Sequence, residues 1–227
     1  MSELKHLAII MDGNRRWAKD NNLPAALGHR EGYKRFREIG DLCRQKGIRT
    51  ITVYAFSTEN WKRNDEEVSD LMDLLRFALN QEIGRLDKEN IRVRIIGRRD
   101  DLSQDLQDLI ARAEEQTKDN DSGDLNIAIS YGGREEITNA VKKIVASGIA
   151  PESINEETVE KNLYTAGQND PDLLIRCGGQ KRLSNFLLWQ LAYSEIYFTD
   201  VLWPDFDAAE LEKALEFFDK TKRNFGK

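Results

Sequence analysis

The 227-residue sequence contains only two cysteines, Cys43 and Cys177. Two cysteines indicate neither a disulfide framework nor a metal cluster. No apolar run approaches the roughly 18 residues that a membrane-spanning helix needs, and the start lacks the pattern of a signal peptide. A cytoplasmic location is therefore the expectation.

Basic residues are not in excess, because the formal net charge is −6. The chain as a whole therefore does not favour nucleic acid, and any anion site must come from a local cluster of basic residues. There is also no internal repeat, low-complexity tract or Pro/Gly-rich linker. A chain of this length can bury one core, so we expect a single domain over residues 1–227.

The usual nucleotide-binding loops are absent. Neither G-x-x-x-x-G-K-[ST] nor a G-x-G-x-x-G after a strand occurs, so a P-loop or dinucleotide site lacks its main device. A phosphatase with an aspartyl nucleophile would need a carboxylate at position 10, where Ile10 stands.

Strand-like and helix-like segments alternate along the chain. Apolar segments rich in β-branched residues predict strands at 7–11, 48–56, 91–96, 125–130, 173–175 and 196–198. Segments 66–86, 100–117 and 134–147 have the apolar periodicity of helices. Continuous apolar strands between amphipathic helices predict an α/β fold with a mostly parallel sheet covered on both faces.

The segment "HLAIIMDGNRRW" (residues 6–17) ends an apolar run in a carboxylate, a glycine and two guanidiniums. Asp12 would end the first strand, Gly13 would permit a tight turn, and a following helix would offer free N–H groups to a phosphate. Arg15 and Arg16 add donors for phosphate oxygens. A carboxylate among such groups is explained if Mg²⁺ bridges it to the phosphate. In the alternative interpretation, Asp12 caps the helix and the arginines lie on a solvated face.

Four segments together resemble the cis-prenyltransferase (undecaprenyl diphosphate synthase) family: "MDGNRRWA", "GHREG", "TVYAFSTENWKRNDEEV" and "DLLIRCGGQKRLSNFLLWQLAYSEIYF". They keep their order over nearly the whole chain. The resemblance implies a six-stranded parallel sheet with an apolar tunnel, in a homodimeric, Mg²⁺-dependent enzyme that contacts the membrane peripherally. Such an enzyme adds isopentenyl diphosphate repeatedly to an allylic diphosphate such as farnesyl diphosphate. The expected product is a long polyprenyl diphosphate, undecaprenyl diphosphate, which serves cell-wall glycan synthesis.

The resemblance also implies roles for individual residues. Asp12 and Asn60 would be catalytic, and Asp12 and Glu195 would bind the metal. Substrate binding would fall to Gly13, Asn14, Arg15, Arg16, Trp17, His29, Ser57, Thr58, Glu59, Trp61, Arg63, Arg176, Arg182, Leu183 and Ser184. In this scheme the residues after position 12 hold the allylic diphosphate. Arg176, Arg182 and Ser184 would hold isopentenyl diphosphate.

Structural alternatives stand beside several of these roles. Trp17 could be a core anchor, His29 a turn or capping residue, and Arg182 a surface cation. Segment 57–60 could cap a helix, and Glu195 could be a surface acid on an edge strand.

An apolar tunnel would have to come from elements that otherwise look like core. The helix at 71–83 and the strand at 91–96 are the expected walls, with Leu71, Leu75, Leu79, Val93 and Ile95 as candidates. An apolar stripe at helical spacing is also what ordinary core packing requires.

The chain departs from the family pattern at three places. Residues 177–180 read Cys-Gly-Gly-Gln where the family often has Thr-Ser-Gly-Glu, Ala25 stands where it often has Arg, and Arg15 where it usually has Gly.

Two other classes of function stay open. A non-catalytic partner subunit of this fold would typically lose the aspartate that Asp12 retains, and a phosphatase would need a nucleophile that is not apparent.

Overall fold

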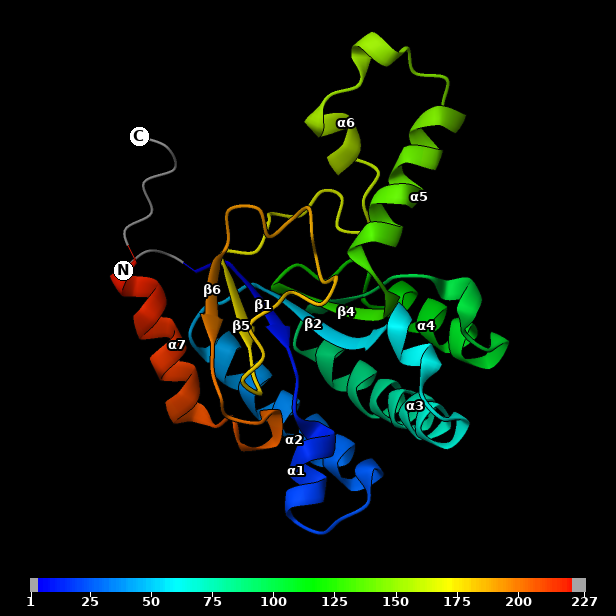
Figure 1. Cartoon of the computed structure of the whole chain (residues 1–227). Coiled ribbons are helices and arrows are strands. Elements are labelled where there is room, and N and C mark those ends of the chain that lie inside the picture. The colour runs from blue at the N-terminus through cyan, green and yellow to red at the C-terminus, as the bar shows by residue number, and fades with distance from the viewer. Residues whose placement is uncertain (1–3, 222–227) are drawn as a thin grey trace.

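The computed structural model describes residues 4–221 and contains one six-stranded sheet in the order β3-β4-β2-β1-β5-β6 (Figure 1). The strands are β1 (His6–Ile10), β2 (Thr50–Ser57), β3 (Ile91–Ile96), β4 (Gly123–Tyr131), β5 (Leu173–Arg176) and β6 (Glu195–Phe198). Every neighbouring pair is parallel. The predicted α/β class and six parallel strands are confirmed, with strand ends shifted by one or two residues.

Seven α-helices are described in residues 4–221. They are α1 (Asn14–Asp20), α2 (Ala25–Gln45), α3 (Asp65–Lys88), α4 (Gln104–Thr117), α5 (Gly133–Ala146), α6 (Glu156–Glu160) and α7 (Ala208–Lys220). Single 3-10 turns occur at η1 (Thr58–Lys62), η2 (Arg99–Asp101), η3 (Pro151–Ser153) and η4 (Trp203–Asp205). No helix in this part of the chain is long and apolar enough to cross a bilayer.

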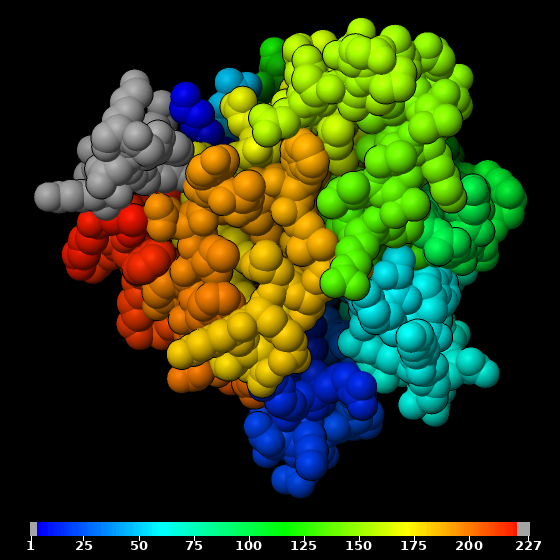
Figure 2. All heavy atoms as spheres, turned by 45° about the horizontal axis from the view of Figure 1, so that its top comes forward, coloured from blue at the N-terminus to red at the C-terminus, as the bar shows by residue number. Residues whose placement is uncertain are grey.

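The two faces of the sheet are covered differently. Because side chains alternate along a strand, Leu7 and Ile9 of β1 join the larger core, which α2, α3, α4 and α7 cover. Ala8 and Ile10 join a smaller core on the other face. That face is covered largely by the irregular segment 183–191, so helices cover it less completely than the sequence predicts. Figure 2 shows the yellow-to-orange part of the chain spread between green α5 and red α7.

The carboxyl ends of β1, β2 and β5 lie together at the end of the sheet where all its strands end; we call this end the carboxyl edge of the sheet. Ile10 at the end of β1 is paired with Arg176 at the end of β5, and β2 leads directly into η1. In parallel sheets the loops at this edge are where ligands bind. The three motif segments that follow these strands therefore come together.

Candidate active site

One carboxylate joins two guanidiniums at this edge. Arg16 Nη2 donates to Asp12 Oδ1 at 3.0 Å, and Arg176 Nη2 donates to Asp12 Oδ2, also at 3.0 Å. The side chain of Arg176 is 3% exposed, whereas that of Asp12 is 31% exposed. Asp12 does not cap α1, whose N-cap is Gly13 without a side-chain hydrogen bond. The capping alternative is therefore wrong, and the carboxylate is positioned by two cations.

Two glycines allow the loops to approach this closely. Gly13 has a φ of 115°, and a Cβ there would lie 2.9 Å from Leu202 Cδ2. Gly178 has a φ of 80°, and a Cβ there would lie 2.4 Å from Arg16 Nη2. The carbonyl oxygen of Gly178 also accepts a hydrogen bond from Arg16 Nη1 at 2.7 Å. Gly178 stands where the family often has Ser, so this departure itself supplies the glycine whose carbonyl oxygen Arg16 contacts.

The segment after β5 holds the second group of donors. Arg176 Nη1 donates to Ser184 Oγ at 2.8 Å and to the carbonyl oxygen of Arg182. The exposed Arg182 donates to Ser184 Oγ at 3.3 Å and to Gln180 Oε1 at 2.6 Å. Ser184 has a φ of 50°, a left-handed conformation that is rare for a non-glycine residue. Leu183 packs against the smaller core, so its position is explained by packing without a substrate contact.

Segment 57–60 does cap a helical turn. The backbone N–H of Ser57 donates to Asn60 Oδ1 at 3.0 Å, which forms half of a capping box at η1. The exposed Glu59 accepts from Asn185 Nδ2 at 3.0 Å, and Thr58 donates to Glu59 at 3.2 Å. The capping interpretation is confirmed, and through Asn185 the segment is joined to the loop that follows Arg176.

A buried acid, Glu67, gathers three predicted site residues. Its Oε1 lies 2.7 Å from Arg63 Nη1 and 3.7 Å from His29 Nε2, and its Oε2 lies 3.4 Å from Arg15 Nη1. Burial lowers the pKa of His29, which favours the neutral imidazole. Glu67 was not among the residues predicted from the sequence, because an acid in the first turn of a helix ordinarily interacts with the helix dipole.

Two tryptophans of the motifs anchor neighbouring segments. Trp17 Nε1 donates to Asp205 Oδ1 at 2.7 Å, which joins α1 to η4. Trp61 Nε1 donates to Ser130 Oγ at 2.8 Å, which joins η1 to the end of β4. Trp61 also packs against the larger core, whereas Trp17 belongs to neither core, so Trp17 joins two segments without being the core anchor of the alternative interpretation.

Glu195 is not brought to Asp12. It begins β6 and pairs with Leu173 at the start of β5, which pairs with Leu7 at the start of β1. At about 3.3 Å per residue, the strand from Leu7 to Ile10 alone spans about 10 Å, and Asp12 lies in the turn beyond it. Glu195 therefore does not lie beside Asp12 in a single chain, and its metal-binding role stays a prediction.

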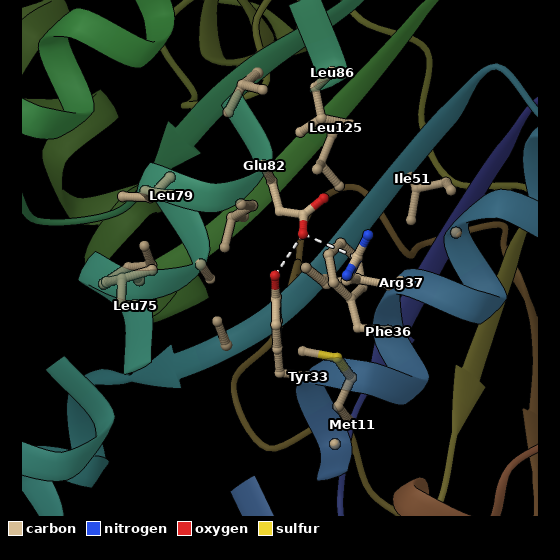
Figure 3. A pocket seen from close by; sticks show the side chains of 18 of the residues that line it. Met11, Tyr33, Phe36, Arg37, Ile51, Leu75, Leu79, Glu82, Leu86 and Leu125 are labelled. Carbon is tan, nitrogen blue, oxygen red and sulfur yellow. Dashed lines mark hydrogen bonds and ion pairs between the residues drawn. The ribbon is translucent and has the colours of Figure 1, made fainter. Parts of the chain in front are cut away.

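An apolar cavity opens beside Asp12, between the sheet and helices α2 and α3 (Figure 3). The cavity has a volume of about 170 Å³, whereas one water needs roughly 10–15 Å³. Asn14 and His29 line it near Asp12, and Leu71, Leu75, Leu79 and Val93 line it farther in. Four of the five candidate wall residues thus face the cavity. Ile95 is not among its lining residues and belongs to the packed core.

The acidic side chains suit a metal that arrives with its substrate. Within residues 4–221, no group of three or more His, Cys, Asp or Glu side chains is arranged to hold a metal ion. Mg²⁺ is commonly held by one or two carboxylates together with water and substrate phosphates. The partly exposed Asp12, a hard oxygen donor beside two guanidiniums, fits that mode.

Comparison with known proteins gives the site its context. The family described as "Putative undecaprenyl diphosphate synthase" matches residues 10–226. The chain belongs to this family. An isoprenyl transferase of Chromobacterium violaceum is 49% identical over 98% of this chain and 88% of its own length. One from Aquifex aeolicus is 48% identical over 98% of this chain and 96% of its own length.

Solved structures agree with this membership of the undecaprenyl diphosphate synthase family. A lavandulyl diphosphate synthase from Lavandula x intermedia, in complex with dimethylallyl diphosphate, has a TM-score of 0.95 at 38% identity, covering 99% of this chain and 98% of that one. A probable undecaprenyl diphosphate synthase from Campylobacter jejuni has a TM-score of 0.85 at 38% identity, with both chains fully covered. The protein is thus a prenyltransferase, while the names of its relatives differ in product.

Proposed function

We propose that this prenyltransferase adds isopentenyl diphosphate repeatedly to an allylic diphosphate, with farnesyl diphosphate as the primer and undecaprenyl diphosphate as the product. The observation that carries the proposal is the position of Asp12. A partly exposed carboxylate held by two arginines stands at the strand ends, between residues Met11 and Asn14, whose side chains line an apolar cavity. A prenyl diphosphate matches this arrangement, because its charged diphosphate would bind at the arginines and its hydrocarbon tail would enter the apolar cavity.

Arg16 and Arg176 define two anion-binding positions on either side of Asp12. Arg16 lies in α1 beside the first-turn N–H groups, which have no partner within the helix. We assign this side to the allylic diphosphate, whose tail would enter the cavity past Asn14 and His29. Arg176, Arg182 and Ser184 form the other side, and we assign them to isopentenyl diphosphate.

Mg²⁺ would be held by Asp12 together with substrate phosphate oxygens. When bound, it would supply neutralisation of the negative charge on the departing diphosphate. Arg16 contributes to the same end, because a fixed guanidinium stabilises charge that develops as the carbon–oxygen bond breaks.

Asn60 serves as a positioning residue in this proposal. Its Oδ1 already accepts from the backbone N–H of Ser57, which leaves the amide N–H₂ as the group available to a ligand. An amide nitrogen donates hydrogen bonds and is a poor proton acceptor. Asn60 would therefore orient the diphosphate or a proton relay rather than remove the proton itself.

The homodimer, the cytoplasmic location and the peripheral membrane contact belong to the same proposal. Apolar side chains lie exposed on α5 and in the segment that follows it through η3, namely Val141, Val145, Ile149 and Ile154. An exposed apolar group of this kind favours a protein contact, and we propose a second copy of the chain as the partner. A product with a long hydrocarbon tail would be released at a membrane surface. We treat residues 1–227 as one catalytic domain.

The decisive experiment incubates the protein with Mg²⁺, farnesyl diphosphate and labelled isopentenyl diphosphate, and then sizes the extracted lipid. We expect a polyprenyl product near the undecaprenyl length. Transfer of a single five-carbon unit, or no transfer, would contradict the proposal. The same assay with dimethylallyl diphosphate as the primer tests the choice of allylic substrate.

A further inference from the structure

Three polar side chains that line the apolar cavity meet one another between α2 and α3. Tyr33 and Arg37 come from α2, and Glu82 comes from α3; all three line the cavity. The hydroxyl of Tyr33 donates to Glu82 Oε1 at 2.5 Å, and Arg37 Nε lies 2.9 Å from the same oxygen. Figure 3 shows the three side chains directed toward one another. We call this group the polar bar.

Glu82 is the buried member of the polar bar, whereas the side chain of Arg37 is 47% exposed. The side chain of Glu82 is 9% exposed, and its second oxygen accepts from Arg85 Nε at 2.8 Å. The ring of Tyr33 also packs edge-on against Phe77 of α3, with the ring centroids 6.0 Å apart. Both ends of the tyrosine side chain therefore join α2 to α3.

Apolar lining continues on both sides of the polar bar. Met11, next to Asp12, lies on one side of it, and Leu86 and Leu125 lie on the other (Figure 3). Leu125 is close to the start of β4, whereas Met11 follows the end of β1, so the cavity extends along the strands from the catalytic edge toward the opposite edge. The polar bar stands between these two apolar parts.

A hydrocarbon chain that grows inward from Asp12 would meet this group. A chain that displaced Tyr33 or Arg37 from Glu82 would leave a buried carboxylate with fewer partners. Hydrocarbon offers Glu82 no hydrogen bond in exchange. We propose that the polar bar of Tyr33, Arg37 and Glu82 is the stop that sets how far the prenyl chain extends. The inference rests on the proposed function and concerns the length of its product.

Replacing Tyr33 tests the proposal. Tyr33→Ala removes both the ring and the hydroxyl from the path, and we expect products longer by one or more five-carbon units. Tyr33→Phe removes only the hydroxyl bond to Glu82 and keeps the contact with Phe77. If Tyr33→Ala does not fold, Tyr33→Phe decides the question, and we expect longer products from it as well. Product lengths are read from chromatograms of labelled lipid, beside the melting temperature of each variant.

Tyr164 supplies the matched control. Its hydroxyl also contacts a carboxylate, Glu135, at 3.2 Å, but it packs on the other face of the sheet. Tyr164→Ala and Tyr164→Phe should leave product length unchanged. Equal or shorter products from folded Tyr33 variants, or longer products from the Tyr164 variants as well, would overturn the stop. If the unmodified protein incorporates no isopentenyl diphosphate, the proposed function itself fails, which is a different result from equal lengths among active variants.

Discussion

Arg176 and Asp12, 164 residues apart in the sequence, form an ion pair of 3.0 Å across the ends of β5 and β1. The arginine is buried and the carboxylate is partly exposed. The buried arginine therefore fixes the position of a carboxylate that solvent can reach. Arg176 also donates to Ser184, so it joins Asp12 to the proposed isopentenyl diphosphate position.

The first prediction concerns Asp12. Asp12→Asn keeps an oxygen for Arg16 or Arg176 but removes the charge, so the fold should persist. Turnover should fall about 10²–10³-fold, the usual cost of removing a group that stabilises transition-state charge. Steady-state rates with and without EDTA would measure it. Asp105→Asn, at an exposed acid paired with Arg76, is the control. Unchanged turnover in Asp12→Asn, or in EDTA-treated protein, would contradict the metal role.

The second prediction separates the two anion positions. Loss of a charge-assisted contact costs about 1.5–3 kcal/mol, roughly tenfold to a hundredfold in affinity. Arg182→Ala should raise KM for isopentenyl diphosphate, and Arg16→Ala should raise KM for the allylic substrate. Arg176→Ala should affect both substrates, because Arg176 contacts both Asp12 and Ser184. Lys181→Ala, at a neighbouring exposed cation, should affect neither. Uniform effects of all three arginines would reject the two-site assignment.

The third prediction uses the difference between cavity wall and core. Leu75→Trp and Leu79→Trp would fill the cavity, so the first condensation should survive while the products become shorter. Ile95→Trp overpacks the core without facing the cavity. It should cost about 1–3 kcal/mol of stability and leave product length unchanged. Product sizing beside thermal unfolding distinguishes these outcomes. Shortened products from Ile95→Trp alone would place the tunnel elsewhere.

The fourth prediction concerns the two histidines, His6 and His29. Burial lowers the pKa of each below the ordinary value of 6.5. The unfolded state therefore binds more protons between the lowered pKa and 6.5, and this contribution to the free energy of unfolding decreases as pH falls through that window. Because the chain has two histidines, their ring proton resonances should form two NMR titration curves, both with midpoints below 6.5. A midpoint at or above 6.5 for either ring would show that it is not buried as described.

Much of the sheet follows from the sequence alone. Runs rich in β-branched residues are continuous because both faces of a parallel strand are buried, and this pattern located all six strands. The sequence also placed Asp12 at a strand end, where a polar residue follows directly on an apolar run. The helix α2, which carries His29 and Tyr33, was not among the predicted helices.

Tertiary structure alone decided which of these residues meet. The parallel register placed Glu195 at the opposite edge from Asp12, and it brought Arg176 within hydrogen-bond distance of Asp12. From the sequence, Glu67 and Glu82 are expected on the solvent-exposed face of an amphipathic helix. In the structure both are buried against residues of other elements. Periodicity along a chain determines which face of a helix or strand is apolar. It does not determine which distant element packs there, because that depends on strand order and on the space that neighbouring side chains leave.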